Sequence, residues 1–379
     1  MIRVLHVIDH LDLGGAQTAL VDMLRHRNRS AFEVEVAVMH GRGPFADMLE
    51  GLGVRVQSLA RAKWPPAYVT EFLRLLRRSD FQVVHFHLQG ANWIAKPLAA
   101  LAGQRVLIAH EHSSGDLRFR GLRSLIPDAS SHLFSTRIIA VSKGVRDFLT
   151  RWEAISPDLI EVVPNAVDEG LLHPCTDEQR RAARSLFSLP VNAFVAGGIG
   201  RLAHEKNFIL LAELAARHPN VYFVVAGSGP ECERIAARVN ELGVKERVRL
   251  LGTVLDRACF YHALDAFLLP SLFEGLPMAV LEAMFSGVPV LSSRLEGISA
   301  IMTNERQGLL ASAGDVEDFS KQLKRLEASP ELGCYLAANA RSNALEQFSA
   351  SVTARRIEDI YRRELGIANA KLADKSSES

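Results

Sequence analysis

Strand-length apolar runs alternate with helix-length amphipathic segments along most of this chain. The runs fall at residues 1–9, 34–39, 54–58, 83–87, 106–110, 138–142 and 160–164, and a second series falls at 194–199, 221–226, 248–252, 266–270 and 288–292. A strand, a helix and another strand in succession form a parallel sheet, because the helix returns the chain to the same sheet edge. The pattern therefore predicts an α/β protein with two doubly wound parallel sheets, one for each series.

The stretch between the two series marks a domain boundary. Residues 168–184 are polar and basic, and the 379-residue chain is long enough to fill two cores of ordinary size. We expect an N-terminal domain over residues 1–170 and a second domain over 171–347. A helix over 348–366 and a mobile tail over 367–379 complete the chain.

Charge and cysteine content exclude several classes of protein. The formal net charge is +1, so nothing in the overall charge indicates nucleic-acid binding. The four cysteines lack the spacing of metal ligands, which favours a reducing cytoplasm. The first nine residues are too short and interrupted for a signal peptide, and no apolar run reaches membrane-spanning length. We expect a cytoplasmic protein, with peripheral attachment to the membrane left open.

Two glutamates, Glu274 and Glu282, flank the start of a predicted helix. Gly275 and Pro277 are typical of a turn and of a first helical turn, and the apolar run 278–285 continues as the helix. The free amides of a helix start favour a phosphate. Helical spacing puts the carboxylates about 12 Å apart, whereas a glycosidase pair needs at most about 9.5 Å. The two acids could instead span an extended ligand such as a nucleotide diphosphate sugar.

An exposed helix face is the alternative explanation for such a pair of glutamates. Residues 266–271 before the pair and 288–293 after it have the composition of buried parallel strands. A strand–turn–helix–strand unit puts the acids at the carboxyl edge of the sheet, where open α/β sheets bind ligands. This context favours a ligand site.

Arg201 and Lys206 are candidate phosphate ligands. They lie in the segment 200–207, which follows the first strand of the second series and precedes a helix. At the same sheet edge as Glu274, the two cations would neutralise a diphosphate and stabilise it as a leaving group. Taken alone, the segment is equally consistent with a charged surface loop.

Two glycine-containing turns follow strands. Gly14 and Gly15 follow the first strand and open a helix, where small residues admit a ligand close to the backbone. The turn 227–230 is similar, but Cys232 replaces the third glycine of the dinucleotide pattern G-x-G-x-x-G. Nicotinamide binding is therefore disfavoured.

Histidine pairs end two strands of the first series. His85 and His87 alternate along one strand, as His110 and His112 do along the next, so each pair presents two imidazoles to one sheet face. Zinc would use such rings, but no further ligand cluster with recognisable spacing accompanies them. One histidine that contacts substrate is favoured over a metal.

Together these segments resemble the retaining family 4 glycosyltransferases. Residues 273–282 resemble the family's E-x7-E signature, 200–207 its G-R-x-x-x-x-K-N loop, 163–168 its P-N-G-V-D segment, 226–230 its G-x-G-P turn and 13–17 its early glycine loop. The resemblance covers nearly the whole chain. It implies the GT-B fold: two Rossmann-like domains facing across a cleft, an acceptor-binding first domain, a nucleotide-sugar-binding second domain and a last helix that crosses back.

The resemblance also implies roles for single residues. Glu274 corresponds to the acid near the donor sugar and the reacting face, and Glu282 to the acid that binds the ribose. Arg201 and Lys206 correspond to the diphosphate clamp. Further donor-binding positions are Gly14, Gly15, Gly275 and Leu276.

A histidine beside the donor sugar is also implied, for which His112 is favoured and His110 is the alternative. Such enzymes retain the anomeric configuration and need no metal, so we expect no cofactor besides the donor substrate. A UDP-sugar is favoured over a GDP-sugar, and the acceptor is a hydroxyl of a glycan or lipid-linked glycan. The basic positions Arg118, Arg120 and Arg123 would contact an anionic membrane, or form a solvated loop.

The chain departs from the family pattern at two turns. Ala166 replaces the glycine of P-N-G-V-D, and of G-G-x-P-E only the second glycine, Gly297, remains. Because both acids and both cations are present, an active transferase is favoured over a non-catalytic partner subunit. A sugar-nucleotide epimerase or a phosphorylase of the same fold is the enzymatic alternative, since a dehydrogenase would require a complete glycine fingerprint.

Overall fold

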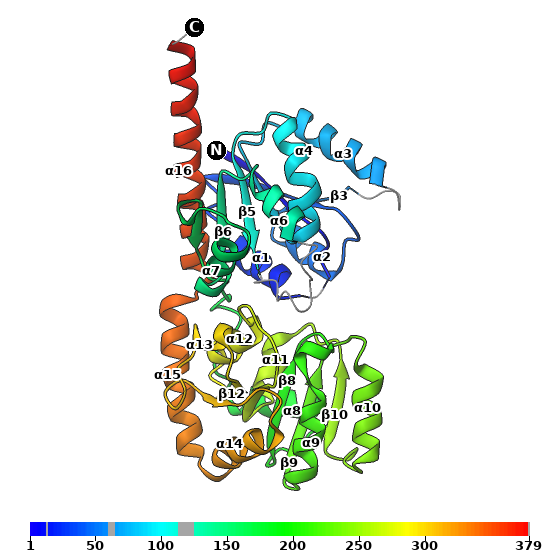
Figure 1. Cartoon of the computed structure of the whole chain (residues 1–379). Coiled ribbons are helices and arrows are strands. Elements are labelled where there is room, and N and C mark those ends of the chain that lie inside the picture. Colours follow the sequence, from blue (N-terminus) through cyan, green and yellow to red (C-terminus); the bar gives the residue numbers. More distant parts are fainter. Residues whose placement is uncertain (13, 60–64, 113–124, 378–379) are drawn as a thin grey trace. The chain divides into compact units, whose positions relative to one another are not determined.

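The computed structural model describes residues 1–12, 14–59, 65–112 and 125–377. The chain divides into two compact units, the first formed by residues 1–166 and 350–379 and the second by residues 167–349. Figure 1 labels many of the helices and strands of each unit. The first unit thus takes up the end of the chain as well as its beginning.

The N-terminal unit is built on a sheet whose strands all run parallel. Within the described residues the sheet has seven strands in the order β3-β2-β1-β4-β5-β6-β7. The strands are β1 (Ile2–Ile8), β2 (Phe32–Val38), β3 (Arg55–Ser58), β4 (Val83–His87), β5 (Leu107–Glu111), β6 (Arg137–Ala140) and β7 (Ile160–Val162). The helices are α1 (Gly15–Arg25), α2 (Pro44–Gly51), α3 (Pro65–Arg78), η1 (Ala91–Ala95), α4 (Lys96–Leu101), α6 (Leu125–His132), α7 (Lys143–Trp152), η3 (Pro157–Leu159) and α16 (Ala350–Ser377).

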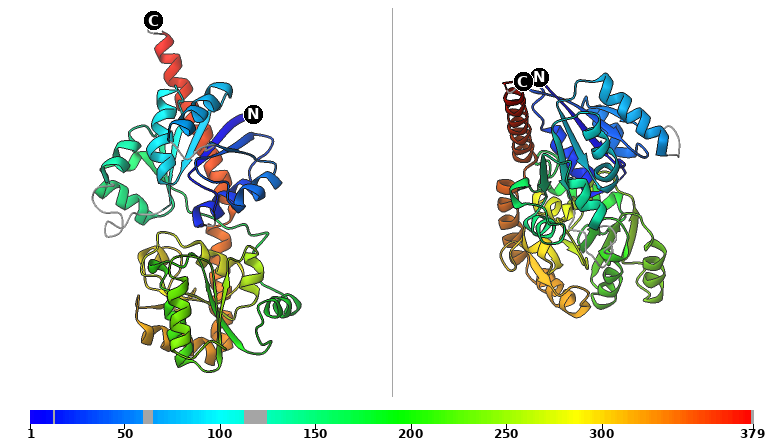
Figure 2. Two further views of the ribbon diagram at one scale, coloured as in Figure 1. Left: turned by 90° about the vertical axis from the view of Figure 1, so that its right-hand side faces the viewer. Right: turned by 45° about the horizontal axis from the view of Figure 1, so that its top comes forward.

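Helices cover both faces of this sheet, because its strands are apolar on both sides. Val4 and Ile8 of β1 pack with Leu20 of α1 and Ile357 of α16 in one core. Side chains at alternate strand positions, including Leu5, pack with α3 and α4 in a second core. The two views of Figure 2 show α16 running beside the sheet of this unit.

The second unit repeats the architecture with a shorter sheet. Its described residues form six parallel strands in the order β10-β9-β8-β11-β12-β13. The strands are β8 (Phe194–Ile199), β9 (Val221–Ala226), β10 (Val248–Gly252), β11 (Ala266–Leu269), β12 (Val290–Ser293) and β13 (Leu309–Ala311). The helices are α8 (Asp177–Leu186), η4 (His204–Lys206), α9 (Ile209–Arg217), α10 (Cys232–Glu241), α11 (Arg257–His262), α12 (Met278–Phe285), α13 (Glu296–Ser299), α14 (Val316–Ala328) and α15 (Pro330–Gln347).

Each sheet has one point at which the strand order reverses. In the first unit the chain moves outward from β1 and then returns to its other side with β4; in the second unit β8 and β11 have the same relation. Loops that leave neighbouring strands at such a point diverge and open a crevice at the carboxyl edge. A ligand site of either unit is therefore expected at its reversal point.

The structure confirms the prediction of two doubly wound parallel sheets and corrects some details. The short edge strand β13 was not predicted. Helix α16 is assigned as far as Ser377, through the segment for which the sequence analysis expected a tail. Among the residues that the structure describes, no helix combines the length and the apolar character needed to cross a membrane.

Candidate active site

Lys206 and Glu274 meet at the reversal point of the second sheet. Lys206 ends η4 in the loop after β8, and Glu274 lies in the loop between β11 and α12. The backbone amide of Leu272 donates to the carbonyl of Glu205 at 2.8 Å, which joins the two loops. Lys206 Nζ lies 2.6 Å from Glu274 Oε1. The acid and one of the two cations predicted to share this edge are thus in direct contact.

Glu274 receives two short contacts at one of its carboxylate oxygens, Oε1. The hydroxyl of Ser271 donates to Glu274 Oε1 at 2.6 Å, the same oxygen that receives Lys206. The Glu274 side chain is 8% exposed, whereas that of Lys206 is 25% exposed. The ammonium group of Lys206 is the more accessible of the two, so it can bind a phosphate while the carboxylate of Glu274 remains buried.

Helix α12 begins close to this pair. Its first helical residue is Met278, so Pro277 is the cap and not the first-turn residue that the sequence predicted. The cap provides no side-chain hydrogen bond. Gly275 and Leu276 form the turn between Glu274 and the cap. The amino end of α12 therefore carries partial positive charge close in the chain to Glu274.

Arg201 lies on the same loop as Lys206, directly after β8, and its side chain is exposed. This loop is braced by the turn after β9. A side chain at Gly227 would overlap the carbonyl oxygen of Gly200, and one at Gly229 would overlap that of Leu202. The amide of Leu202 also donates to the carbonyl of Ser228 at 2.9 Å. The glycines of the second turn therefore support the Arg201 loop.

Gly297 explains why one glycine of the altered family pattern remains. A Cβ atom at this position would overlap the carbonyl oxygen of Gly275 and would lie 2.6 Å from that of Glu274. Helix α13, which begins at Glu296, therefore packs directly against the turn that carries Glu274. Only glycine fits this contact without moving the turn.

Glu282 lies inside α12 and contacts a different cation from Glu274. Its Oε1 is 2.6 Å from Arg257, and its Oε2 accepts a hydrogen bond of 2.9 Å from the hydroxyl of Tyr261. Glu282 is 4% exposed, and burial raises the pKa of Tyr261 well above its usual value. Arg257 and Tyr261 were not predicted from the sequence, because their four-residue separation shows only that they share one helix face and does not place that face beside α12.

The glycine loop of the first unit follows β1 as predicted. Gly14 is the extended N-cap of α1, and Gly15 is the first residue of that helix. The amide of Thr18 donates to the carbonyl of Gly14 at 2.9 Å. Gly15 is exposed, so the backbone of this helix start is accessible. Leu13 lies outside the described residues.

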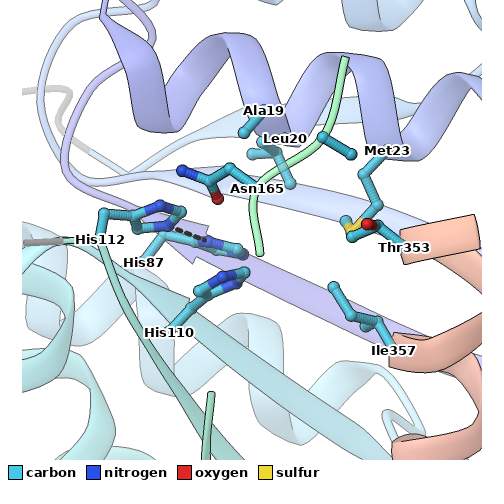
Figure 3. A pocket seen from close by; sticks show the side chains of 10 residues that line it. Ala19, Leu20, Met23, His87, His110, His112, Asn165, Thr353 and Ile357 are labelled. Carbon is cyan, nitrogen blue, oxygen red and sulfur yellow. Dashed lines mark hydrogen bonds between the residues drawn. The ribbon is translucent and has the colours of Figure 1, made fainter. Parts of the chain in front are cut away.

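A stripe of five histidines crosses the first sheet. His6 of β1 is in register with His85 of β4, and His87 of β4 is in register with His110 of β5. His112 follows β5, two residues after His110. All five side chains lie on the face that α1 and α16 cover, and Figure 3 shows the three at the carboxyl end of the stripe. Four of these residues were predicted from the sequence, and His6 was not.

The five histidine side chains of the stripe are uncharged near pH 7. Burial lowers the pKa of His6 to about 3 and that of His112 to about 4. Burial and the neighbouring imidazoles hold the pKa values of His85, His87 and His110 well below the usual range. The rings are therefore hydrogen-bonding groups and potential metal ligands, and they carry no charge.

Of the two histidines proposed to face the donor, His112 is the more accessible. His110 is 4% exposed, whereas His112 is half-buried at the end of the stripe. His112 Nε2 lies 3.3 Å from Nδ1 of His87, which orients its ring (Figure 3). The basic positions Arg118, Arg120 and Arg123 lie outside the described residues.

Comparison with known proteins agrees with this architecture. The family described as glycosyl transferases group 1 matches residues 180–343, and glycosyltransferase family 4 matches residues 13–171. HepE from Anabaena, solved in complex with UDP and glucose, aligns with a TM-score of 0.86 over 96% of this chain and 100% of HepE, at 19% identity. The fold and the two matches define the class of protein: a glycosyltransferase with the GT-B fold.

Curated relatives are also glycosyltransferases. The UDP-Gal:alpha-D-GlcNAc-diphosphoundecaprenol alpha-1,3-galactosyltransferase of Escherichia coli is 26% identical over 300 residues, which are 76% of this chain and 77% of the relative. The lipopolysaccharide core biosynthesis glycosyltransferase LpsE of Rhizobium meliloti is 34% identical over 166 residues, 44% of this chain and 49% of LpsE. The chain belongs to the group 1 and family 4 glycosyltransferases.

Proposed function

We propose that this protein transfers a sugar, with retention of anomeric configuration, from a nucleotide diphosphate sugar to a hydroxyl of a glycan or lipid-linked glycan. The contact that carries the proposal is the one between Lys206 and Glu274 at the reversal point of the second sheet. A cation, a buried acid and a helix start at one crevice match the phosphates and hydroxyls of such a donor. UDP is the favoured nucleotide, and GDP is its competitor.

The proposed reaction breaks the bond between the anomeric carbon and the diphosphate oxygen. Negative charge then grows on the leaving nucleoside diphosphate. Lys206, the exposed Arg201 and the amide groups at the start of α12 would stabilise that charge. The acceptor oxygen forms the new bond to the anomeric carbon and gives up its proton.

The other proposed roles divide between the two units. Glu274 would contact the sugar near the reacting face, and Glu282 would accept hydrogen bonds from the ribose. A carboxylate has about four lone-pair sites, so the contacts of Glu282 with Arg257 and Tyr261 leave about two of them unused. In the first unit, His112 would contact the donor sugar, and Gly14 and Gly15 would let a ligand approach the backbone.

A thermal-shift panel of UDP-sugars and GDP-sugars tests the donor. The best donor should raise the melting temperature of the wild type, because it binds only the folded state. Lys206→Ala should abolish this rise, since the variant lacks the diphosphate cation. Arg234→Ala is a matched control, because Arg234 pairs with Glu231 on an exposed helix face. A donor shift that survives in Lys206→Ala would exclude the proposed clamp.

Turnover is measured as release of nucleoside diphosphate with an acceptor present. Glu274→Gln keeps the size of the side chain and removes its charge, so donor binding should persist while turnover falls by about 100-fold. Unchanged turnover in this variant would remove Glu274 from the reacting face. Donor binding without release of nucleotide by the wild type would favour a non-catalytic partner subunit.

Retention and metal independence are tested on the product. NMR of the anomeric proton should show the configuration of the donor in the new linkage. Activity should persist after treatment with a chelator if no metal takes part in the chemistry. Inversion of configuration, or full loss of activity with the chelator, would overturn the corresponding part of the proposal.

We also propose a cytoplasmic location with peripheral contact to anionic lipid. This part is supported by the basic positions Arg118, Arg120 and Arg123 and by the lipid-linked substrate named for the relative from Escherichia coli. Anionic vesicles should sediment more wild type than a variant with all three arginines changed to serine. Equal sedimentation of the two proteins would remove membrane contact through this segment.

A further inference from the structure

The carboxyl end of the histidine stripe gathers three imidazoles around one small space. His87, His110 and His112 each offer a ring nitrogen, and these three atoms lie within 4.8 Å of one another. His87 and His110 are in register on neighbouring strands, and His112 follows on the same face. The sheet therefore brings the three side chains together, while His110 and His112, whose rings are stacked with centroids 4.2 Å apart and planes at 17°, must turn about their side-chain bonds to direct both nitrogens at one ion.

The separation of His87 and His112 suits a tetrahedral metal ion. Their facing atoms, Nδ1 of His87 and Nε2 of His112, lie 3.3 Å apart. Two nitrogen ligands about 2.05 Å from a tetrahedral zinc ion are separated by about 3.3 Å. The same distance is long for a hydrogen bond between two nitrogens.

His110 lacks the partner that its burial requires. The side chain is 4% exposed, and neither ring nitrogen has a hydrogen-bond partner within the described part of the chain. A buried polar group without a partner costs about 1–3 kcal/mol, so each such group in a native protein needs an explanation. A metal ion between the three rings would supply the missing contact.

His6 is hydrogen-bonded to His87 in the way that a residue outside a coordination shell orients a histidine that binds the metal. Nε2 of His87 lies 2.9 Å from Nδ1 of His6. When His87 donates this hydrogen bond, its Nδ1 keeps a free lone pair that points toward His112. Histidines that bind metals commonly use their second nitrogen in this way.

A cavity lies beside the three rings, as Figure 3 shows. Besides the three histidines, polar Asn165 and Thr353 line it, and the remaining lining is apolar: Ala19, Leu20, Met23, Ala166 and Ile357. A site with three protein ligands keeps one coordination position for water, which needs such a space. The second group of three histidines, His6, His85 and His87, is more deeply buried, and there Tyr361 already bonds to His85 at 2.7 Å.

We propose that His87, His110 and His112 form a binding site for one zinc ion. Imidazole nitrogens suit zinc among the divalent ions of the cell, and other first-row ions of similar preference should compete for the site. The inference does not depend on the proposed transfer reaction. The two proposals share His112, whose ring would contact the donor only when no ion binds it. Zinc binding is measured without donor or acceptor, so its failure leaves the proposed transfer reaction intact.

The experiment uses the full chain without a histidine tag, stripped with a chelator and then dialysed against Zn²⁺. We expect one zinc ion per chain, a rise in melting temperature and, with Co²⁺ in place of Zn²⁺, the intense visible bands of a tetrahedral ion. Absence of zinc binding by the wild type would overturn the inference.

Three variants locate the ion. His110→Leu removes a ring that has no hydrogen bond to lose, so the fold should survive while zinc affinity falls by more than about tenfold. His112→Gln removes a different one of the three rings and should lower zinc affinity to the same extent. His204→Asn alters an exposed histidine of the second unit and should bind zinc like the wild type. Circular dichroism of each variant shows that loss of zinc is not loss of fold.

His85→Asn separates the two groups of three histidines. If the ion binds where we propose, this variant should keep most of its affinity. Loss of zinc in His85→Asn together with retention in His110→Leu would move the ion to the deeper group and overturn the assignment. Equal binding by every variant would identify surface binding and would also overturn it.

Discussion

Arg257 and Glu282 form an ion pair of 2.6 Å between α11 and α12. The two side chains are 17% and 6% exposed, and the hydroxyl of Tyr261 donates to the second carboxylate oxygen at 2.9 Å. The acid that is proposed to bind ribose is therefore neutralised from within its own unit. Removing one partner of a shielded pair leaves a buried charge without compensation.

A double-mutant cycle measures this pair. Arg257→Met alone should lower the free energy of unfolding by about 2–3 kcal/mol, because it strands the carboxylate of Glu282. The double variant with Glu282→Gln should lose less than the sum of the single losses, with a coupling of at least about 1 kcal/mol. Urea denaturation gives the free energy of unfolding of each variant. If the losses of the two single variants add up to that of the double variant, the contact contributes nothing to stability.

An exposed pair is the control for this cycle. Arg362 and Asp359 lie 2.7 Å apart on α16 with side chains 45% and 72% exposed. Water screens such a pair, so its coupling should stay below about 1 kcal/mol. Comparable coupling in the two cycles would contradict the role that we assign to burial.

Gly297→Ala should impair turnover more than it impairs folding. The new Cβ atom would overlap the carbonyl oxygen of Gly275 and must displace the turn that carries Glu274. A displacement of about 1 Å in a catalytic group can cost about 100-fold in rate. Turnover with the best donor and acceptor measures the effect.

Gly333→Ala is the matched control in the same unit. Its Cβ atom would meet Pro289 at 3.7 Å, an ordinary contact, within helix α15. Alanine should stabilise this helix by about 0.5–1 kcal/mol and leave turnover unchanged. Equal turnover in both glycine variants would show that the contact at Gly297 does not position Glu274.

The sequence predicted the fold well because the pattern of buried strands is local. Every parallel strand except β13 was found from apolar runs bounded by turns, and β13 has only three residues to signal its presence. The cap of α12 was misplaced by one residue, since proline is compatible with either position at a helix start. Strand order could not be derived from the runs themselves.

The site was predicted in part, for a related reason. Neighbouring loops at one sheet edge could be inferred, and Lys206 and Glu274 are in contact there. The partners of Glu282 were missed, because α11 comes to α12 only through the packing of the second unit. Four of the five histidines of the stripe were predicted, and His6 was missed for the same reason. His6 joins it through the pairing of β1 with β4, which follows from tertiary structure.

The buried histidines should make the protein sensitive to acid. The pKa of His6 is about 3 in the folded chain against 6.5 without burial. The unfolded chain therefore takes up the proton first as the pH falls, so stability is complete above pH 6.5 and declines below it. Between pH 6.5 and 4.5, His6 alone should lower the free energy of unfolding by about 2–3 kcal/mol.

Urea denaturation between pH 7.5 and 4.5, with a chelator present, checks this decline. His6→Gln should flatten the pH dependence relative to the wild type, whatever its stability at pH 7.5. His204→Asn, at an exposed position, should leave the slope unchanged. The same slope in His6→Gln and the wild type would show that His6 titrates normally in the folded protein.

Asp265 binds two arginines that differ in burial, and the more buried one should matter far more for stability. Arg184 is 2% exposed, and its Nη2 lies 2.6 Å from Oδ2 of Asp265, while its Nε donates to the carbonyl of Ala263 at 3.1 Å. Arg180 lies equally close to the other oxygen, Oδ1, but its side chain is 36% exposed. Arg184→Met should cost about 3–5 kcal/mol, because it strands buried acceptors, and Arg180→Met about 1 kcal/mol or less. Urea denaturation measures the free energy of unfolding of both variants, which carry the same substitution at two partners of one carboxylate. Similar losses of stability would show that burial does not set the strength of this contact.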